Sequence, residues 1–378
     1  MRRSAWGIAG SPLLALALAA PHLGASPPIG SPLLEVLLDS EIPIAVPNTG
    51  AEPRGREEAR QLARHAAAAY AKKDYDRAIA AYTEAIRLDP GRAALHNNRA
   101  AARLGKKDEA GALVDYNEAI RLDPENASAY YGRGLVWHSR KDYDRAIADF
   151  DEALRRPPKF SGAYNNRGLA WFDKHEYDKA IADFNEALRL DPDSPLIYNN
   201  RGNCREAQGD LDRALRDYSE AIRLDPQYVK ARGNRARLFA SEGKATEALE
   251  DLGEVIRLDP KGSRAYRARA WILATSPDAS VRNGKEAISD ASKAFELTGR
   301  DDPIILETLA AAHAEVGQFQ EAVSMQGKAL GLLSPADARR PAFESRLALY
   351  REGHAYHEPE PTALVSKSRR LRKSSWHR

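Results

Sequence analysis

The stretch YDKAIADFNEALRLDP, from Tyr177 to Pro192, decides the fold of this 378-residue chain, because close copies of it recur at a fixed distance. Copies of its closing phrase EALRLDP end at six prolines, and successive prolines are 34 residues apart: Pro90, Pro124, Pro158, Pro192, Pro226 and Pro260. Each proline is expected to end a helix, because the residue before a proline is pushed out of the α region. Such a regular period is typical of proteins built from stacked supersecondary units.

Each 34-residue unit predicts two helices joined by a short turn. In the unit that begins at 161, apolar or small residues fall at helical spacing in two stripes, Tyr164, Gly168 and Trp171 followed by Ala180, Phe184 and Ala187. The turn between them reads Lys-Asp-Tyr in other units, at 73–75 and 141–143. The aspartate of that turn is expected to accept backbone N–H groups at the start of the second helix.

A single hairpin of this kind cannot bury its apolar stripes, whereas a stack of hairpins can. The eighth position of every unit is small, which fits a close approach of the paired helices: Ala66, Ala100, Gly134, Gly168, Gly202, Ala236, Ala270 and Ala310. The units resemble the tetratricopeptide repeat (TPR), in its bacterial variety with Asn-Asn-Arg-Gly in the first helix, as at 165–168 and 199–202. The resemblance covers residues 59 to 336. It implies an all-α fold, a right-handed α-solenoid (superhelix) of eight helix-turn-helix repeats with a C-terminal capping helix.

The repeats are expected at 59–92, 93–126, 127–160, 161–194, 195–228, 229–262, 263–302 and 303–336. The seventh contains five extra residues within 275–285, where Asp278 and Arg282 are expected to lock a long turn. Phe343, Leu347 and Tyr350 predict a capping helix within 337–357. A proline-rich linker is predicted at 26–58 and a disordered basic tail at 358–378.

The first 25 residues are predicted to be a signal peptide. Arg2 and Arg3 precede an apolar run at 5–20, with cleavage expected after Ala19 or Ala25. An uncleaved N-terminal membrane anchor, or a start codon placed too early, is the alternative. We therefore expect an exported protein of the periplasm or cell envelope. The only cysteine, Cys204, excludes an internal disulfide.

The charges nearly balance, with 57 basic and 54 acidic side chains, so the net charge identifies no partner. Basic residues do gather in the tail, at Lys367, Arg369, Arg370, Arg372 and Lys373, with Arg378 at the end. This tail is predicted to adhere to an anionic surface through electrostatic attraction. The alternative is a solvated terminal run without a ligand.

An arginine at the seventh position and an aspartate at the twenty-third recur together in repeats two to seven. The pairs are Arg99 with Asp115, Arg133 with Asp149, Arg167 with Asp183, Arg201 with Asp217, Arg235 with Asp251, and Arg269 with Asp290. Both are missing together from repeats one and eight. This joint occurrence predicts an ion pair between the two helices of one repeat, and it disfavours pairing between neighbouring repeats. The alternative is a basic ladder for an acidic ligand.

The stripe of the first helix that is not used for packing is the candidate partner-binding groove. By resemblance to other TPR proteins, this stripe lines a concave groove in which a partner peptide lies. Its candidate residues are Asn97, Tyr131, His138, Asn165, Phe172, Asn199, Asn203, Asn234, Arg237, Arg264, Arg267 and Trp271. Asparagine amides both donate and accept hydrogen bonds, so a row of them suits an extended peptide backbone. The alternative is that these amides join the helices to one another.

Repeats five to seven suggest a sharper hypothesis. Some TPR chaperone adaptors hold a peptide carboxylate in a clamp of lysine, arginine and asparagine, and Asn203, Asn234 and Arg264 match that clamp here. Asn199 and Ala268 stand where the clamp has cations, although Arg237 and Arg267 lie close in register. The hypothesis is a segment of the groove that accepts an anion or a carboxylate. The alternative is an ordinary polar groove.

No catalytic motif is present. The segments outside the repeats contain no phosphate-binding glycine loop, no nucleophile elbow and no metal quartet. His354 and His357 beside Glu358 form only a weak metal-binding pattern. We expect no enzymatic activity, no cofactor and no small-molecule substrate.

The expected function is a non-catalytic protein–protein interaction scaffold or adaptor that binds partner peptides in the groove. The alternatives are a cell-envelope tether that adheres through its tail, or a regulatory subunit of a separately encoded enzyme. The sequence leaves the partner, the pathway and the oligomeric state open.

Overall fold

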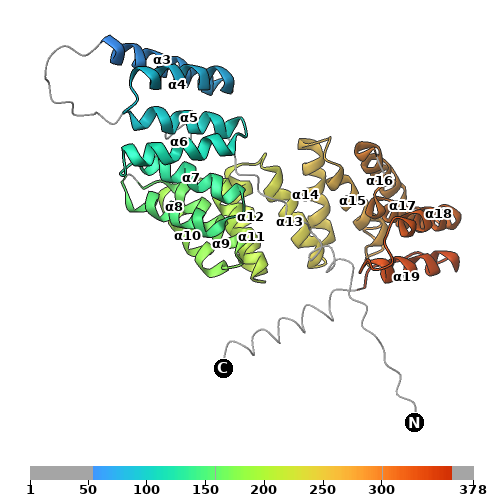
Figure 1. The fold of residues 1–378 in the computed structure, drawn as a ribbon. Coiled ribbons are helices and arrows are strands. Elements are labelled where there is room, and N and C mark those ends of the chain that lie inside the picture. Colours follow the sequence, from blue (N-terminus) through green and yellow to red (C-terminus); the bar gives the residue numbers. More distant parts are fainter. Residues whose placement is uncertain (1–53, 158, 300, 360–378) are drawn as a thin grey trace. The chain divides into compact units, whose positions relative to one another are not determined.

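A computed structural model describes residues 54–157, 159–299 and 301–359. These ranges form 17 α-helices, α3 to α19, and no strands, which confirms the predicted all-α repeat fold (Figure 1). The predicted signal peptide, nearly all of the linker and nearly all of the basic tail lie outside the described residues.

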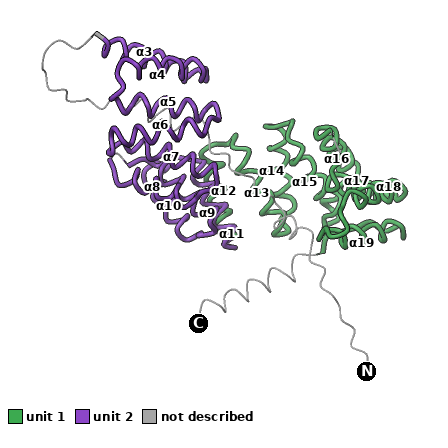
Figure 2. The backbone as a smooth tube through the Cα atoms, in the orientation of Figure 1, with its two compact units in different colours: residues 1–23, 211–378 green, residues 24–210 purple. Residues whose placement is uncertain are grey.

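The helices fall into two compact units, which Figure 2 colours separately. The unit of residues 24–210 contains α3 (Arg54–Ala71), α4 (Tyr75–Leu88), α5 (Ala93–Gly105), α6 (Glu109–Leu122), α7 (Ala127–Ser139), α8 (Tyr143–Arg155), α9 (Ser161–Asp173), α10 (Tyr177–Leu190) and α11 (Pro195–Ala207). The unit that includes residues 211–378 contains α12 (Leu211–Leu224), α13 (Val229–Ser241), α14 (Ala245–Leu258), α15 (Ser263–Thr275), α16 (Gly284–Thr298), α17 (Pro303–Glu315), α18 (Phe319–Gly331) and α19 (Arg340–Arg351). Within each unit, the two helices of every complete repeat pack on one another.

The turn between the paired helices is fixed by a cap and by a left-handed residue. Asp74 and Asp142 accept hydrogen bonds from backbone N–H groups at 3.2 Å, as predicted. The residue before the cap position has a left-handed backbone conformation, which the sequence pattern did not predict. Its φ is 60–80° at Lys73, Lys107, Lys141, His175, Gly209, Gly243 and Gly317. A residue with a β-carbon is strained there, by about 1–2 kcal/mol.

In repeats three and four, the core lies between the two helices, where a glycine faces an aromatic ring. Phe150 and Phe184 are fully buried. A β-carbon on Gly134 would lie 2.7 Å from Cε1 of Phe150, and one on Gly168 would lie 2.9 Å from Cε1 of Phe184. The close approach predicted for the eighth position is therefore confirmed at these two glycines.

Because of this packing, we expect two glycine-to-alanine changes to have opposite effects on the stability of the protein. Gly134→Ala is expected to destabilise the protein by about 1 kcal/mol net, since overpacking costs about 1–3 kcal/mol and the better helix propensity of alanine returns about 1 kcal/mol. Gly253→Ala in α14 is the matched control, because a β-carbon there meets nothing within 4 Å. Urea denaturation should show the control stabilised. An equal gain in both variants would contradict the packing account.

The first helices of neighbouring repeats also contact one another directly. In the unit of residues 24–210, α3 packs on α5, α5 on α7, α7 on α9 and α9 on α11, whereas the second helices approach one another less closely. In the other unit, α15 packs on α17. Each stack therefore curves toward its first helices, whose exposed side chains form what we call the inner face.

Three predicted boundaries shift. Helix α3 begins at Arg54, before the predicted start of the repeats at 59, because the charged residues after Pro53 favour a helix. The capping helix α19 is shorter than the predicted 337–357, since Pro341 fixes its start and Gly353, with φ of 77°, turns the chain after its end. Glu358 and Pro359 are ordered parts of the described chain rather than the beginning of a tail.

Asp278 and Arg282 both hold the long turn of repeat seven, each through a different partner. Arg282 donates to the backbone carbonyls of Ser276 and Pro277, at 2.9 and 3.2 Å, and to Glu315 on α17 at 2.9 Å. Asp278 accepts from the backbone and the hydroxyl of Ser280, at 2.8 and 2.7 Å. The turn is therefore also joined to the next repeat.

Candidate functional site

The predicted ion pairs between the helices of one repeat are present in five repeats. In each, the arginine donates from two nitrogens to both oxygens of its aspartate, at 2.6–2.8 Å: Arg99 to Asp115, Arg133 to Asp149, Arg167 to Asp183, Arg235 to Asp251, and Arg269 to Asp290. The five aspartates are buried. In the sixth predicted pair, Arg201 belongs to one unit and Asp217 to the other, so this pair stays a prediction.

As predicted, none of these arginines pairs with the position-23 aspartate of a neighbouring repeat, but four of them, together with Arg201, reach a different side chain of the preceding repeat. The remaining guanidinium nitrogen donates to a polar side chain at position 25 of that repeat, at 2.5–3.2 Å: Arg99 to Thr83, Arg133 to Asn117, Arg167 to Asp151, Arg201 to Asn185, and Arg235 to Ser219. The run of polar residues at position 25 was the signal that the analysis missed. These guanidinium groups hold neighbouring repeats together, so they do not form a free basic ladder for an acidic ligand.

The electrostatic surroundings of the aspartates in these Arg–Asp ion pairs differ between repeats. Burial raises the pKa of Asp115, but the His96 ring 3.9 Å away, the hydrogen bonds from Arg99 and the charge of Arg103 outweigh burial and leave this pKa below its ordinary value. Burial also raises the pKa of Asp183, and Arg167 offsets only part of that effect because Asp151 lies close by. Two arginines share one carboxylate at Asp115, through Arg99 and Arg103, and at Asp251, through Arg232 and Arg235.

Part of the asparagine row joins repeats to one another. The amide of Asn166 donates to the hydroxyl of Tyr131 at 2.8 Å, and the amide of Asn200 donates to Oδ1 of Asn165 at 2.9 Å. All four side chains are buried. At these positions the geometry supports the structural alternative, since two of the candidates, Tyr131 and Asn165, accept hydrogen bonds that hold adjacent first helices together.

The groove candidates separate into buried and accessible residues. Five of them have at most 6% of their surface exposed: Asn97, Tyr131, Asn165, Asn199 and Trp271. The others are partly or fully exposed: His138, Phe172, Asn203, Asn234, Arg237, Arg264 and Arg267. All lie on first helices, as predicted. That a partner contacts them stays a prediction.

The accessible part of the inner face in the unit of residues 24–210 is aromatic and amide in character. Phe172 packs against Tyr177, with ring centroids 5.7 Å apart and ring planes tilted by 54°. His138 on α7 lies 3.0 Å from the carboxylate of Asp173 on α9, and Asn203 follows on α11. These side chains suit an extended peptide with apolar groups, because rings supply contact area and amides supply both kinds of hydrogen bond.

In the other unit, Trp271 is covered rather than open. The guanidinium of Arg346 on α19 lies 5.5 Å from its ring centroid, and the ring of Tyr356 lies 6.2 Å away. Arg346 also pairs with Glu307 on α17, and both side chains are almost fully buried. Burial raises the pKa of Glu307 to about 6, although Arg346, Arg267 and Arg339 act in the opposite direction.

The carboxylate-clamp hypothesis spans both units, because Asn203 belongs to one and Asn234 and Arg264 to the other. Within the second unit, Arg264 and Arg267 lie close enough for the charge of Arg264, together with burial, to lower the pKa of Arg267. Asp302 and Glu307 compensate part of this repulsion. The clamp stays a prediction.

Comparison with known proteins agrees with this geometry. The family model described as "Tetratricopeptide repeat" matches residues 63–123, 112–159, 139–195, 165–229 and 199–263. The chain belongs to the tetratricopeptide-repeat family. No curated protein matches the chain.

Two similar solved structures support the fold, with TM-scores of 0.50 and 0.51. A TPR protein from Parabacteroides merdae is 21% identical, with a TM-score of 0.50 over 68% of this chain and 99% of that one. PilF of Pseudomonas aeruginosa is 22% identical, with a TM-score of 0.51 over 57% of this chain and 97% of its own. YrrB, described as a TPR protein with an unusual peptide-binding site, is 26% identical, with a TM-score of 0.42 over 50% of this chain and 97% of its own.

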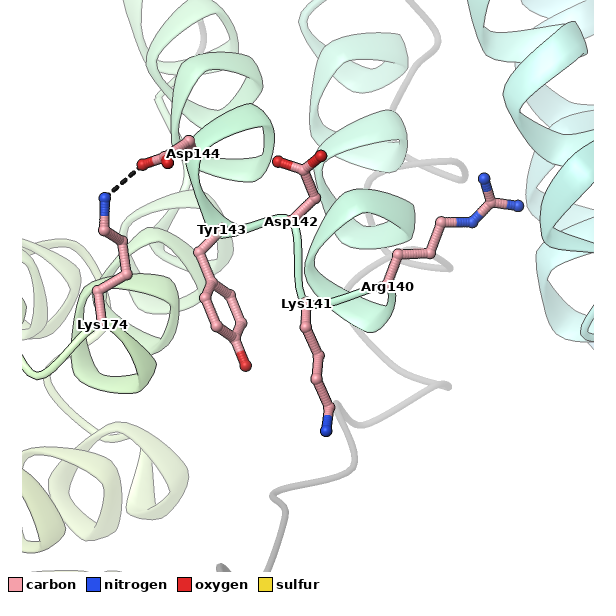
Figure 3. A pocket seen from close by; sticks show the side chains of 6 residues that line it. All are labelled: Arg140, Lys141, Asp142, Tyr143, Asp144 and Lys174. Carbon is pink, nitrogen blue, oxygen red and sulfur yellow. Dashed lines mark hydrogen bonds and ion pairs between the residues drawn. The ribbon is translucent and has the colours of Figure 1, made fainter.

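TPR proteins are generally non-catalytic repeat scaffolds. One shallow pocket at the turns is lined by Arg140, Lys141, Asp142, Tyr143, Asp144 and Lys174 (Figure 3). Its charges are mostly engaged: Lys174 pairs with Asp144, Arg140 lies 3.0 Å from Glu109, and Asp142 caps α8. The pocket therefore lies among side chains that connect neighbouring repeats.

The described ranges of this TPR chain contain no group of three His, Cys, Asp or Glu side chains that could hold a metal ion. His357 pairs with Glu315 at 2.7 Å instead of meeting His354 in a metal site. No helix of these ranges is long and apolar enough to cross a membrane.

Proposed function

We propose that this TPR protein is a non-catalytic scaffold that binds an extended peptide segment of a partner protein on the inner face of α7, α9 and α11. The observation that carries the proposal is the combination of rigidly held first helices with partly exposed side chains on them. Inter-repeat bonds from Asn166 and Asn200 fix the first helices, while His138, Phe172 and Asn203 remain partly exposed on them. Preorganised side chains of this kind reduce the entropy cost of binding a peptide.

The proposal includes export, supported by the charged start and the apolar run of the first 25 residues. A tether to an anionic surface through Lys367, Arg369, Arg370, Arg372 and Lys373 is the second candidate function, supported by a tail without acidic residues. Regulation of a separately encoded enzyme is a special case of the scaffold. Deletion of residues 366–378 separates the first two, because a tether loses surface retention whereas a scaffold keeps its partner.

The scaffold is tested by capturing partners from native extract with the full chain and with a Phe172→Ala/Asn203→Ala variant. The matched control is Arg155→Ala/Arg189→Ala, which changes exposed residues on the second helices α8 and α10. The inner-face variant is expected to lose about tenfold or more in affinity, since interface hot spots cost about 2 kcal/mol or more. Equal capture by all three chains would contradict the proposal, provided that circular dichroism shows equal helicity.

A further inference from the structure

The chain does not leave the repeats when α19 ends. Gly353 adopts a left-handed conformation and turns the chain, and residues 354–359, which we call the strap, run back onto the first helices α15 and α17. The backbone N–H of Glu358 donates to the carbonyl of Thr275 at the end of α15, at 2.7 Å. His357 lies 2.7 Å from the carboxylate of Glu315 at the end of α17.

Two strap side chains are enclosed at this part of the inner face, the ring of Tyr356 and the carboxylate of Glu358. Tyr356 lies beside Trp271, and the guanidinium of Arg346 lies 5.0 Å from the centre of the Tyr356 ring. Glu358, two residues later, is 6% exposed. Burial and the carboxylate of Glu358 both raise the pKa of the Tyr356 hydroxyl, which agrees with a ring and an acid enclosed together.

The strap is nevertheless held by few bonds. Within the described residues, one backbone hydrogen bond joins it to the repeats, that of Glu358 with Thr275. Helix α19, by contrast, is anchored by Phe343 and Tyr350, which are at most 2% exposed. Ala355 and Tyr356 do pack against buried residues of the last repeats. A segment with so few backbone hydrogen bonds to the repeats nevertheless opens locally at lower cost than the helices beneath it.

We propose that the strap is a removable occupant of the inner face of the last two repeats, and that it occupies a site for an external peptide with an aromatic residue followed two positions later by an acid. The second half of this proposal rests on the proposed scaffold function, whereas the first half does not. An occupant on the same chain competes at a high effective concentration, so an external peptide is excluded until the strap leaves. The face of repeats seven and eight is then a regulated binding site.

Hydrogen exchange on the full chain tests the first half. The Glu358 amide should be protected in the wild type, and Tyr356→Ala should speed its exchange by about tenfold or more while α15, α17 and α19 keep their protection. His354→Ala is the matched control, because this strap side chain is exposed and should change nothing. A Glu358 amide that exchanges at the free-peptide rate in the wild type would overturn the proposal. Loosening of α17 or α19 by Tyr356→Ala would also overturn it, because the strap would then be part of the fold.

A fluorescein-labelled peptide of residues 352–359 tests the second half by fluorescence anisotropy. It should bind full-length Tyr356→Ala about tenfold more tightly than the wild type, and the same peptide with alanine for its tyrosine should bind neither chain. Equal binding by both chains, or binding by neither, contradicts a site for an external peptide. Neither result depends on partner capture at α7, α9 and α11, so failure here and failure of the proposed function are distinguishable.

Discussion

Replacing Asp149 with alanine is expected to lower the free energy of unfolding by about 3 kcal/mol, because it leaves a partly buried guanidinium without its main partner. Arg133 donates to both carboxylate oxygens of Asp149 at 2.8 Å, and its side chain is only 23% exposed. After the change, the guanidinium keeps the bond to Asn117 in the preceding repeat. That bond cannot compensate the charge.

Urea denaturation followed by circular dichroism measures this effect. Glu118→Ala is the control, since it removes an exposed pair with Arg121 and should cost less than about 1 kcal/mol. Replacing both partners, as Arg133→Met/Asp149→Leu, is expected to recover most of the loss, because no charge then remains unpaired. If Asp149→Ala costs no more than Glu118→Ala, the ion-pair ladder does not determine the stability of the repeats.

The second large effect is expected at the last repeat, where Glu307→Ala should cost about 3–5 kcal/mol in the unit that contains it. Arg346, the partner of Glu307, has a side chain only 3% exposed. Its guanidinium faces the rings of Trp271, Phe343 and Tyr356, which cannot replace a carboxylate as a hydrogen-bond acceptor. The measurement is urea denaturation above pH 6, where Glu307 is ionised.

Glu307→Gln separates charge from hydrogen bonding at this position. The pKa of Glu307 is raised from 4.5 to about 6, so the folded state favours the protonated carboxyl. The stability that this preference adds is fully present below pH 4.5 and is lost as the pH rises through about 6. The stability of the wild type minus that of Glu307→Gln should therefore fall across this window. A difference that rises with pH would contradict the account.

The repeat fold could be predicted because each of its determinants is local. The phrase that ends at Pro192 identifies the second helix, and Asp142 marks the start of another. The pairing of Arg167 with Asp183 was also predictable, since both are lost together in the terminal repeats. The bond from Arg167 to Asp151 was missed, because the analysis assigned each arginine one partner although a guanidinium has five N–H donors.

The candidate site was less predictable, because its character depends on contacts between distant segments. Position on a helix could place Trp271 on the inner face, but it could not show that Arg346 and Tyr356 cover it. Nor could the asparagine phrase show whether Asn200 meets a peptide or Asn165, since both uses require the same residue. Exposure after folding decides between such alternatives.

The most direct test of the central claim, that a partner binds on the inner face of the first helices, is a hydrogen-exchange footprint of the full chain with and without its captured partner. We expect new protection on α7, α9 and α11 around His138, Phe172 and Asn203, with the second helices α8 and α10 unchanged. Protection confined to α8 and α10, or to the basic tail, would contradict the account.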